Sequence, residues 1–196
     1  SVLFTRGETV RAVDFKLAPR AYVEQRIDGL PPVFVTPPPE ALKKIKREAA
    51  SKRKARGELT QRGGFAEAFI WPVAGRITGV YGSRRFYNGE TRRPHYGIDI
   101  AAPAGTPIQA PATGRVTLAS PDMYFEGGLI FLDHGLGVTS VFMHLETLAV
   151  KVGDEVAQGD IIGTVGSTGR STGPHLDWRM YWADQRIDPA LLAPPR

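Results

Sequence analysis

The later two-thirds of the chain repeat one pattern: a short apolar run, then glycine and other turn residues, then another apolar run. The runs recur at intervals of roughly 10 to 15 residues, a spacing typical of an antiparallel all-β domain. No stretch here repeats apolar residues with the period of a helix. The pattern predicts a mainly β domain over residues 65–196, built as an antiparallel sheet or sandwich. Its strands are expected within residues 70–73, 76–82, 97–100, 114–119, 128–133, 138–144, 160–166 and 175–180.

The first part of the chain carries weaker strand signals. Residues 9–16 and 21–27 alternate apolar and polar side chains, Asp28-Gly29 is a turn signal, and Pro31-Pro32 ends the second run. One or two strands cannot bury a core by themselves. Residues 1–36 are therefore a short β segment, either the remnant of a separate N-terminal β domain or a piece that packs on the main one.

A basic helix is expected between these two parts. Three prolines at 37–39 break the chain, and residues 40 to about 56 are rich in Ala, Lys, Arg and Glu, with Leu42, Ile45 and Ala49 at helical spacing. Glycines at 57, 63 and 64 end this segment. Residues 37–64 therefore form a helix with a thin apolar stripe, followed by a linker.

The chain of 196 residues has a net charge of +5, and residues 42–62 hold nine Lys and Arg against two Glu. A basic segment can meet nucleic acid, anionic lipid or a cell-wall polymer. No aromatic residues interleave these charges as a stacking surface for bases would need, so we expect a solvated basic helix and no nucleic-acid partner. No stretch approaches the about 18 apolar residues that span a bilayer, and no signal peptide is visible at the start.

The absence of cysteine limits the chemistry. It excludes disulfides, thiolate metal ligands and a cysteine nucleophile, so any metal site must use His, Asp and Glu. All four histidines lie in the β part, three of them in distinctive settings: His95 four residues before Asp99, His144 after an apolar run, and His175 two residues before Asp177.

These residues can be combined into one metal site. Side chains two apart on a strand share a face, so His175 and Asp177 should project together. A catalytic zinc site needs three protein ligands and an open position for water. His95, Asp99 and Asp177 could supply the ligands, and His144 and His175 would remain free to move protons. The spacing alone is a weak signal, because isolated histidines in β domains are more often structural.

Residues from about 69 to 189 resemble the LytM-type, or lysostaphin-like, M23 family of zinc metallopeptidases. The resemblance does not cover residues 1 to about 64. Its landmarks follow the order of the family over roughly 120 residues. These landmarks are Trp71-Pro-Val with Gly75-Arg-Ile-Thr, Tyr81-Gly-Ser-Arg, His95-Tyr-Gly-Ile-Asp99, residues 102–108, Asp133-His134-Gly135, Met143-His144-Leu145, residues 153–156 with 159–163, and residues 166–169 leading to Gly173-Pro-His175-Leu-Asp177.

The resemblance implies a peptidase domain with a groove that hydrolyses peptide cross-links in bacterial peptidoglycan. It implies Zn²⁺ on His95, Asp99 and the position of Asp177, with His144 and His175 catalytic, while His134 matches a non-catalytic position. The partner would be the stem peptides of the wall, met outside the cytoplasmic membrane. The protein would then work in the periplasm or extracellularly, peripheral to the cell envelope.

Asp177 departs from the family, which has a second histidine there in an H-x-H pair. If that histidine binds through Nδ1, an aspartate can replace it with little backbone movement; if through Nε2, Asp177 falls about 2 Å short. With one imidazole and two carboxylates as ligands, the zinc centre is also formally neutral, which makes it a weaker Lewis acid than a centre with two imidazoles and one carboxylate. We expect a working but slower site, because the other four positions are intact. The alternative is a catalytically degenerate domain that binds cell wall or activates a separate amidase.

Overall fold

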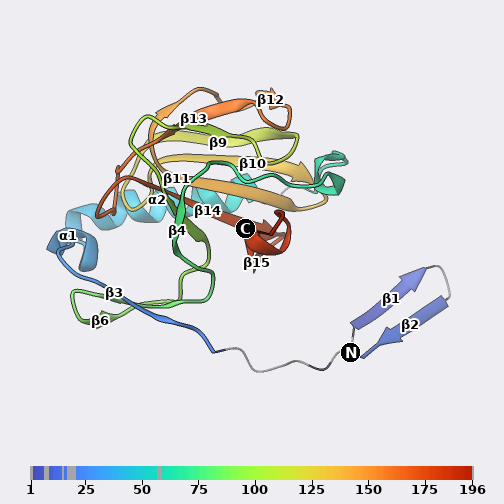
Figure 1. The fold of residues 1–196 in the computed structure, drawn as a ribbon, viewed down its shortest axis with the longest axis horizontal. Coiled ribbons are helices and arrows are strands. Elements are labelled where there is room, and N and C mark those ends of the chain that lie inside the picture. The colour runs from blue at the N-terminus through green and yellow to red at the C-terminus, as the bar shows by residue number, and fades with distance from the viewer. Residues whose placement is uncertain (1, 7–8, 15, 17–20, 57–58, 196) are drawn as a thin grey trace.

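The computed structural model describes residues 2–6, 9–14, 16, 21–56 and 59–195, and its main element is a ten-stranded antiparallel sheet (Figure 1). This confirms the predicted mainly β fold. Seven strands follow one another in the order β12 (Glu155–Val156), β9 (Gly114–Met123), β10 (Gly127–Gly135), β11 (Val138–Leu148), β14 (His175–Trp182), β7 (Ile98–Ala101) and β4 (Arg76–Gly79). Three more pair beside this path: β13 (Ile161–Val165) with β11 and β8 (Pro107–Gln109), and β15 (Gln185–Ile187) with β14.

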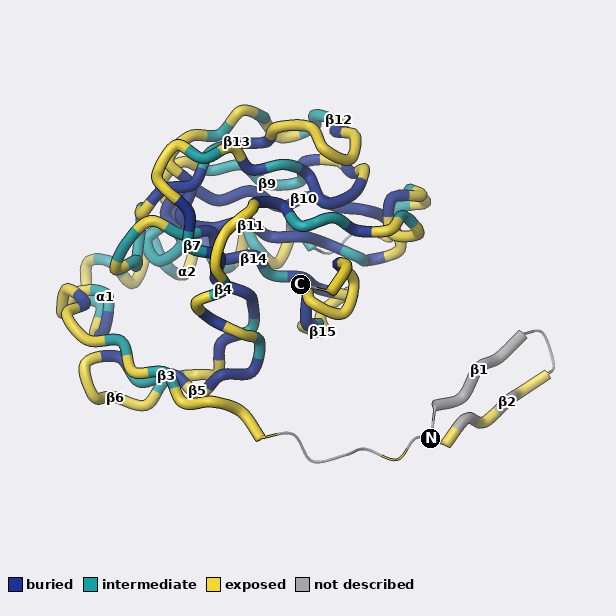
Figure 2. The backbone as a smooth tube through the Cα atoms, viewed as in Figure 1, coloured by how far each residue is buried: buried dark blue, intermediate teal, exposed yellow. Residues whose placement is uncertain are grey.

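The alternation along β14 sends its side chains to two different faces of the sheet. Leu176 and Trp178 are fully buried in the main core, whose strands form the dark band of Figure 2. Burial of side chains of this size stabilises the fold by about 1.5–3 kcal/mol each. Asp177 and Arg179, between and after them, face the opposite side. The same period that builds the core therefore sets a row of polar groups on the other face.

A smaller apolar cluster covers part of this second face, beneath the basic helix α2 (Pro39–Arg56). Ala55 of the helix packs against the cluster, which consists of Met123, Leu129, Phe131, Val141, Met143 and Tyr181. The predicted helix is confirmed to within one residue at its start. None of the described helices is long and apolar enough to cross a membrane.

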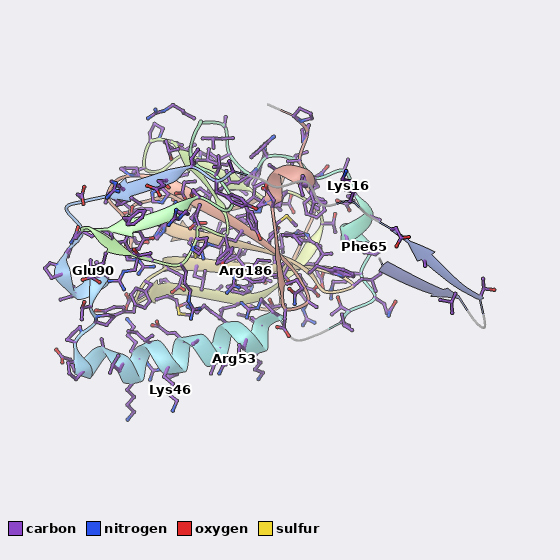
Figure 3. All side chains as sticks on the ribbon, turned by 90° about the horizontal axis from the view of Figure 1, so that it is seen from below. Lys16, Lys46, Arg53, Phe65, Glu90 and Arg186 are labelled. Carbon is purple, nitrogen blue, oxygen red and sulfur yellow. The ribbon has the colours of Figure 1, made fainter. Side chains whose placement is uncertain are left out.

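Polar contacts, more than an apolar stripe, hold α2 on the sheet. The buried Glu48 carboxylate accepts a hydrogen bond from the backbone N–H of Tyr124 at 3.0 Å, and Lys44 Nζ lies 2.8 Å from Asp122 Oδ2. Leu42, expected on the apolar stripe, is 54% exposed, so that part of the prediction was wrong. Lys46 and Arg53 point away from the body of the protein (Figure 3), as expected for a solvated basic face.

The N-terminal segment divides between two places. Strands β1 (Val2–Arg6) and β2 (Thr9–Val13) pair with each other, whereas β3 (Glu24–Ile27) runs parallel to β5 (Arg84–Tyr87), which also pairs with β6 (Glu90–Thr91). Of the two alternatives for this segment, β3 therefore packs on the main domain. The proposed boundary at residue 65 stays a prediction.

The short helix α1 (Pro32–Val35) was not predicted. Pro31-Pro32 was interpreted only as the end of a strand, but proline is also tolerated in the first turn of a helix, where its missing N–H is not needed. Two 3₁₀ turns, η1 (Gly64–Ala66) and η2 (Pro189–Leu191), complete the described elements.

Candidate metal centre and active site

The strand pairing brings His95, Asp99 and Asp177 together. Strands β7 and β14 are antiparallel neighbours, and in their register Asp99 stands directly opposite Asp177. His95 precedes β7 and lies with its Nε2 3.0 Å from Asp99 Oδ1 and its Nδ1 4.0 Å from Asp177 Oδ2. All three side chains are buried, and one ligand atom from each lies within 4.8 Å of the others.

Two glycines make room for these carboxylates. A Cβ added at Gly97 would lie 2.5 Å from Asp177 Oδ1 and 2.6 Å from the Arg179 side chain. A Cβ at Gly79 would collide with Asp99 Oδ2 and with the guanidinium of Arg85. Any larger residue at either position would displace a candidate ligand, so both glycines serve close packing around the site.

Each carboxylate is also held by an arginine that the sequence analysis did not single out. Arg179 binds Asp177 with two nitrogens, Nε 3.1 Å from Oδ1 and Nη2 2.7 Å from Oδ2, and buried Arg85 pairs with Asp99 Oδ2. Burial acts to raise the pKa of Asp177, but Arg179 and His95 outweigh it and lower this pKa below its ordinary value. Burial is likewise outweighed at Asp99, whose pKa is lowered by His95 and Arg85. Both groups are therefore ionised at neutral pH.

The cluster fits a bound divalent cation. Among the described residues, His95 Nδ1, His95 Nε2 and Asp99 Oδ1 are buried polar atoms that lack a hydrogen-bond partner, which is costly unless something else satisfies them. Tetrahedral zinc with bonds of about 2.1 Å separates its ligand atoms by about 3.4 Å. One ligand atom from each of the three residues lies within 4.8 Å of the others, so small side-chain movements would bring them to this separation. The donor set, one imidazole and two carboxylates, suits zinc.

His144 and His175 face each other beside this cluster, with their ring centroids 4.8 Å apart. His144 Nδ1 lies 2.8 Å from the carbonyl oxygen of Thr168, and His175 Nδ1 lies 2.8 Å from that of Gly173. A carbonyl only accepts, so each Nδ1 carries the proton and donates. In the neutral ring Nε2 then has a free lone pair, and both histidines can accept a proton there.

His144 carries two further signs of a specialised position. Its φ of +67° is in the left-handed region, which is strained for a residue with a side chain. Burial, followed by the neighbouring His175, lowers the pKa of His144 to about 4, so the ring is neutral at pH 7. A neutral ring held by its Nδ1 proton keeps the lone pair of Nε2 available at pH 7.

A cavity of about 350 Å³ opens over these groups. Asp99, Asp177, His144 and His175 all line it, and His95 lies behind the two carboxylates. Gln25, Ile27 and Leu30 from the N-terminal segment line the opposite side, which the sequence analysis did not anticipate. The cavity is large enough for a short stretch of peptide.

His134 and the two tryptophans of β14 lie away from this cavity. His134 is fully buried, with Nδ1 2.9 Å from the carbonyl oxygen of Thr113 and Nε2 2.8 Å from the Ser140 hydroxyl, so both ring nitrogens have partners inside the fold. Trp178 belongs to the core, and Trp182 is 61% exposed at the strand end. None of the three is among the residues that line the cavity.

A buried imidazole and two carboxylates, with two more imidazoles beside them at the floor of a cleft, define the class of metal-dependent hydrolases. The sequence profile of peptidase family M23 matches residues 93–189. The catalytic domain of the antimicrobial peptidase lysostaphin from Staphylococcus simulans is 35% identical, with a TM-score of 0.53 over 60% of this chain and 90% of that domain. The chain belongs to peptidase family M23.

Two further comparisons support the membership of the chain in family M23. A Pseudomonas aeruginosa protein whose crystal structure carries the peptidase M23 name is 41% identical, with a TM-score of 0.70 over 79% of this chain and 62% of that one. The DD-carboxypeptidase/endopeptidase Mpg of Neisseria meningitidis is 38% identical over 138 residues, which make up 70% of this chain and 31% of Mpg. The chain spans only 26% to 31% of the length of the first curated relatives that it matches.

Proposed function

We propose that the protein is a zinc metalloendopeptidase that hydrolyses peptide cross-links of bacterial peptidoglycan. The observation that carries this proposal is the buried cluster of His95, Asp99 and Asp177 beside the facing rings of His144 and His175. Wall cross-links exist only outside the cytoplasmic membrane, so the proposed site of action is the periplasm or the cell exterior. Relatives named as peptidoglycan endopeptidases support the same substrate.

His95, Asp99 and Asp177 would hold the zinc ion. When bound, zinc leaves one position for water, lowers the pKa of that water and polarises the scissile carbonyl. The two carboxylates are ionised before the metal binds, and both ring nitrogens of His95 lack a hydrogen-bond partner among the described residues.

The paired histidines would move the protons of the reaction. Each has its Nδ1 proton fixed on a carbonyl oxygen, which leaves Nε2 free towards a group in the cavity. One Nε2 can accept the proton of the attacking water, and the other, once it carries a proton, can donate a hydrogen bond to the tetrahedral oxyanion. A protonated imidazole then returns a proton to the leaving amine. Both rings have the same arrangement of Nδ1 on a carbonyl oxygen, so either histidine can take either role.

Arg179 and Arg85 counteract one effect of having two carboxylate ligands, which make the zinc centre formally neutral. Each guanidinium shares the negative charge of one carboxylate ligand, so less of that charge is donated to the metal. This supports a working Lewis acid in spite of the Asp177 substitution. The degenerate alternative is less favoured, because a domain that only binds would not need both free histidines in place.

The test combines metal analysis with substrate digestion. The purified chain, loaded with zinc and dialysed, should retain one zinc per molecule and release soluble muropeptides from isolated murein sacculi. Asp177→Ala should lose both properties, whereas His144→Ala should retain the metal and lose the products. A chain that binds zinc in the Asp177→Ala variant as well as in the wild type would remove Asp177 from the site. Failure of the wild type to bind zinc would overturn the proposal.

A further inference from the structure

A second cavity, of about 320 Å³, lies beside the candidate metal centre and is lined by arginine. His95 forms part of its wall, and no aspartate or glutamate lines it among the described residues. The six arginines around it are Arg85, Arg92, Arg93, Arg170, Arg179 and Arg186. Such a concentration of one charge on a concave surface attracts an anion.

Half of these arginines have no carboxylate partner. Arg85 pairs with Asp99, Arg179 with Asp177, and Arg92 with Glu90. Arg93, Arg170 and Arg186 form no ion pair with any described carboxylate. When the three ion-paired arginines are left out of the count, the cavity keeps an excess of about three positive charges.

Arg170 is held in position for a ligand, although burying its positive charge costs free energy. Its guanidinium stacks on the rings of Phe125 at 4.5 Å and Tyr87 at 4.9 Å, which fixes its plane. Burial lowers the pKa of Arg170, and the nearby positive charges of Arg179 and Arg92 act in the same direction. Tyr87 and Glu126 act against this shift, and a cation that is partly desolvated and has two like charges nearby is stabilised when an anion enters.

Arg92 and Arg186 have fixed positions as well. Arg186 stacks on Tyr96 at 4.5 Å, and Arg92 Nη2 donates to the carbonyl oxygen of Val35 at 2.8 Å. Arg92 Nε is buried without a hydrogen-bond partner among the described residues. An oxyanion in the cavity would find donors that are already oriented, at little cost in side-chain entropy.

The arginine cavity shares a wall with the cleft of the candidate active site. Arg85, Tyr87, Arg170 and Arg179 line both cavities. A peptide residue spans only about 3.3–3.6 Å. Because the two cavities share these four residues, an anionic group in the arginine cavity would belong to a substrate residue close to the scissile bond.

From this adjacency we infer that the arginine cavity binds a free carboxylate of the substrate next to the bond that is cut. The inference rests on the proposed function and narrows its substrate class. A cross-link through the second amine of a diamino dicarboxylic acid keeps a free carboxylate on the carbon that bears this amine, beside the bond, whereas the inner bonds of a glycine bridge have none. The protein is thereby a peptidase of stem-peptide cross-links that carry a carboxylate.

The experiment uses a matched pair of cross-linked stem peptides that differ only in a carboxylate or a carboxamide beside the cross-link. The full chain is treated with chelator, which prevents turnover, and binding is measured by calorimetry. The carboxylate peptide should bind at least about tenfold more tightly, and added salt should reduce this ratio. Arg93→Gln combined with Arg186→Gln should lower the ratio to about twofold, because both side chains are exposed and their removal spares the fold. Arg76→Gln removes an exposed arginine outside both cavities and should keep the full ratio.

Failure of the inference is separable from failure of the proposed function. Equal affinity of the wild type for the two peptides would overturn the carboxylate site, even if the zinc-loaded protein digests sacculi. Faster cleavage of a glycine bridge than of the carboxylate cross-link would overturn it too, with the metallopeptidase activity intact. Tighter binding of the carboxylate peptide by a protein that never cleaves it would support the site and reject the enzyme.

Discussion

Arg179 and Asp177 stand two residues apart on β14, on the same face of the sheet, and the guanidinium binds the carboxylate through Nε and Nη2 at 3.1 and 2.7 Å. The aspartate that replaces a family histidine thus comes with a cation that neutralises it. The pair keeps Asp177 ionised and oriented in a site where its side chain is 2% exposed. We expect the two residues to depend on each other and on the metal.

The first prediction concerns Arg179→Leu. Without the guanidinium, the metal-free protein must bury the Asp177 charge with less compensation, which should destabilise it by about 3 kcal/mol. Zinc would supply the missing positive charge, so the rise in Tm on adding zinc should be larger in Arg179→Leu than in the wild type. Scanning calorimetry with zinc and with chelator measures both values. Equal shifts in the two proteins would show that Arg179 and the metal do not act on the same carboxylate.

The second prediction concerns Gly97→Ala. The new methyl group would lie 2.5 Å from Asp177 Oδ1 and 2.6 Å from Arg179, so the carboxylate must move. We expect zinc affinity to fall by about 10- to 100-fold and stability to fall by about 1–3 kcal/mol. Gly63→Ala is the matched control, since a Cβ there meets nothing within 4 Å and Gly63 needs no positive φ. Competition with a fluorescent zinc chelator gives the affinities, and a Gly97→Ala affinity equal to that of the control would contradict the packing role.

The pattern of residue types along the chain predicted those elements that form through interactions between residues close in sequence. The helix over residues 40–56 followed from composition between a proline break and glycines, and α2 covers Pro39–Arg56. The alternation over residues 175–180 placed His175 and Asp177 on one face, opposite the buried Leu176 and Trp178. By the same rule Arg179 shares the face of Asp177, so this ion pair could have been predicted from spacing alone.

Contacts between distant segments could not be predicted in the same way. Arg85 reaches Asp99 through the placement of β5, and β3 joins β5 by parallel pairing, for which the sequence of either strand carries no local signal. The arginine cavity gathers residues from 85 to 186, most of which lie in loops or at strand ends. The family resemblance pointed to the candidate ligands, but the arginine that compensates the charge of Asp99 became visible only in three dimensions.

The third prediction separates metal binding from proton transfer. His144→Ala should bind zinc as the wild type does, because His144 is outside the candidate ligand set, and its kcat should fall by about 10²–10⁴. Turnover is followed by release of labelled muropeptides, and zinc by elemental analysis of the same sample. The fold has a strained φ at this position, so a circular dichroism spectrum must show that the variant is folded. Full activity in folded His144→Ala would remove this residue from the mechanism.

The last prediction uses His134, which lies in the core away from the active-site cavity. Burial lowers the pKa of His134 to about 4 from an ordinary value of 6.5. Between these two values the unfolded chain takes up a proton that the folded chain refuses, so stability should fall as the pH falls from 6.5 to 4. The loss approaches about 3 kcal/mol for this group, and His144 adds a similar contribution because its pKa is also lowered to about 4. Above pH 6.5 neither histidine should change the stability.

Denaturant unfolding in chelator, at several pH values from 4.5 to 6, measures this slope without a contribution from metal release. One proton difference corresponds to about 1.4 kcal/mol per pH unit, so the two histidines together should approach twice that slope. His134→Gln can keep contacts to the Thr113 carbonyl oxygen and the Ser140 hydroxyl but does not titrate, and it should lower the slope by about half. Asp99 and Asp177 titrate below this window, since the pKa values of both are lowered. An unchanged slope in His134→Gln would mean that the folded protein protonates this ring as readily as the unfolded chain does.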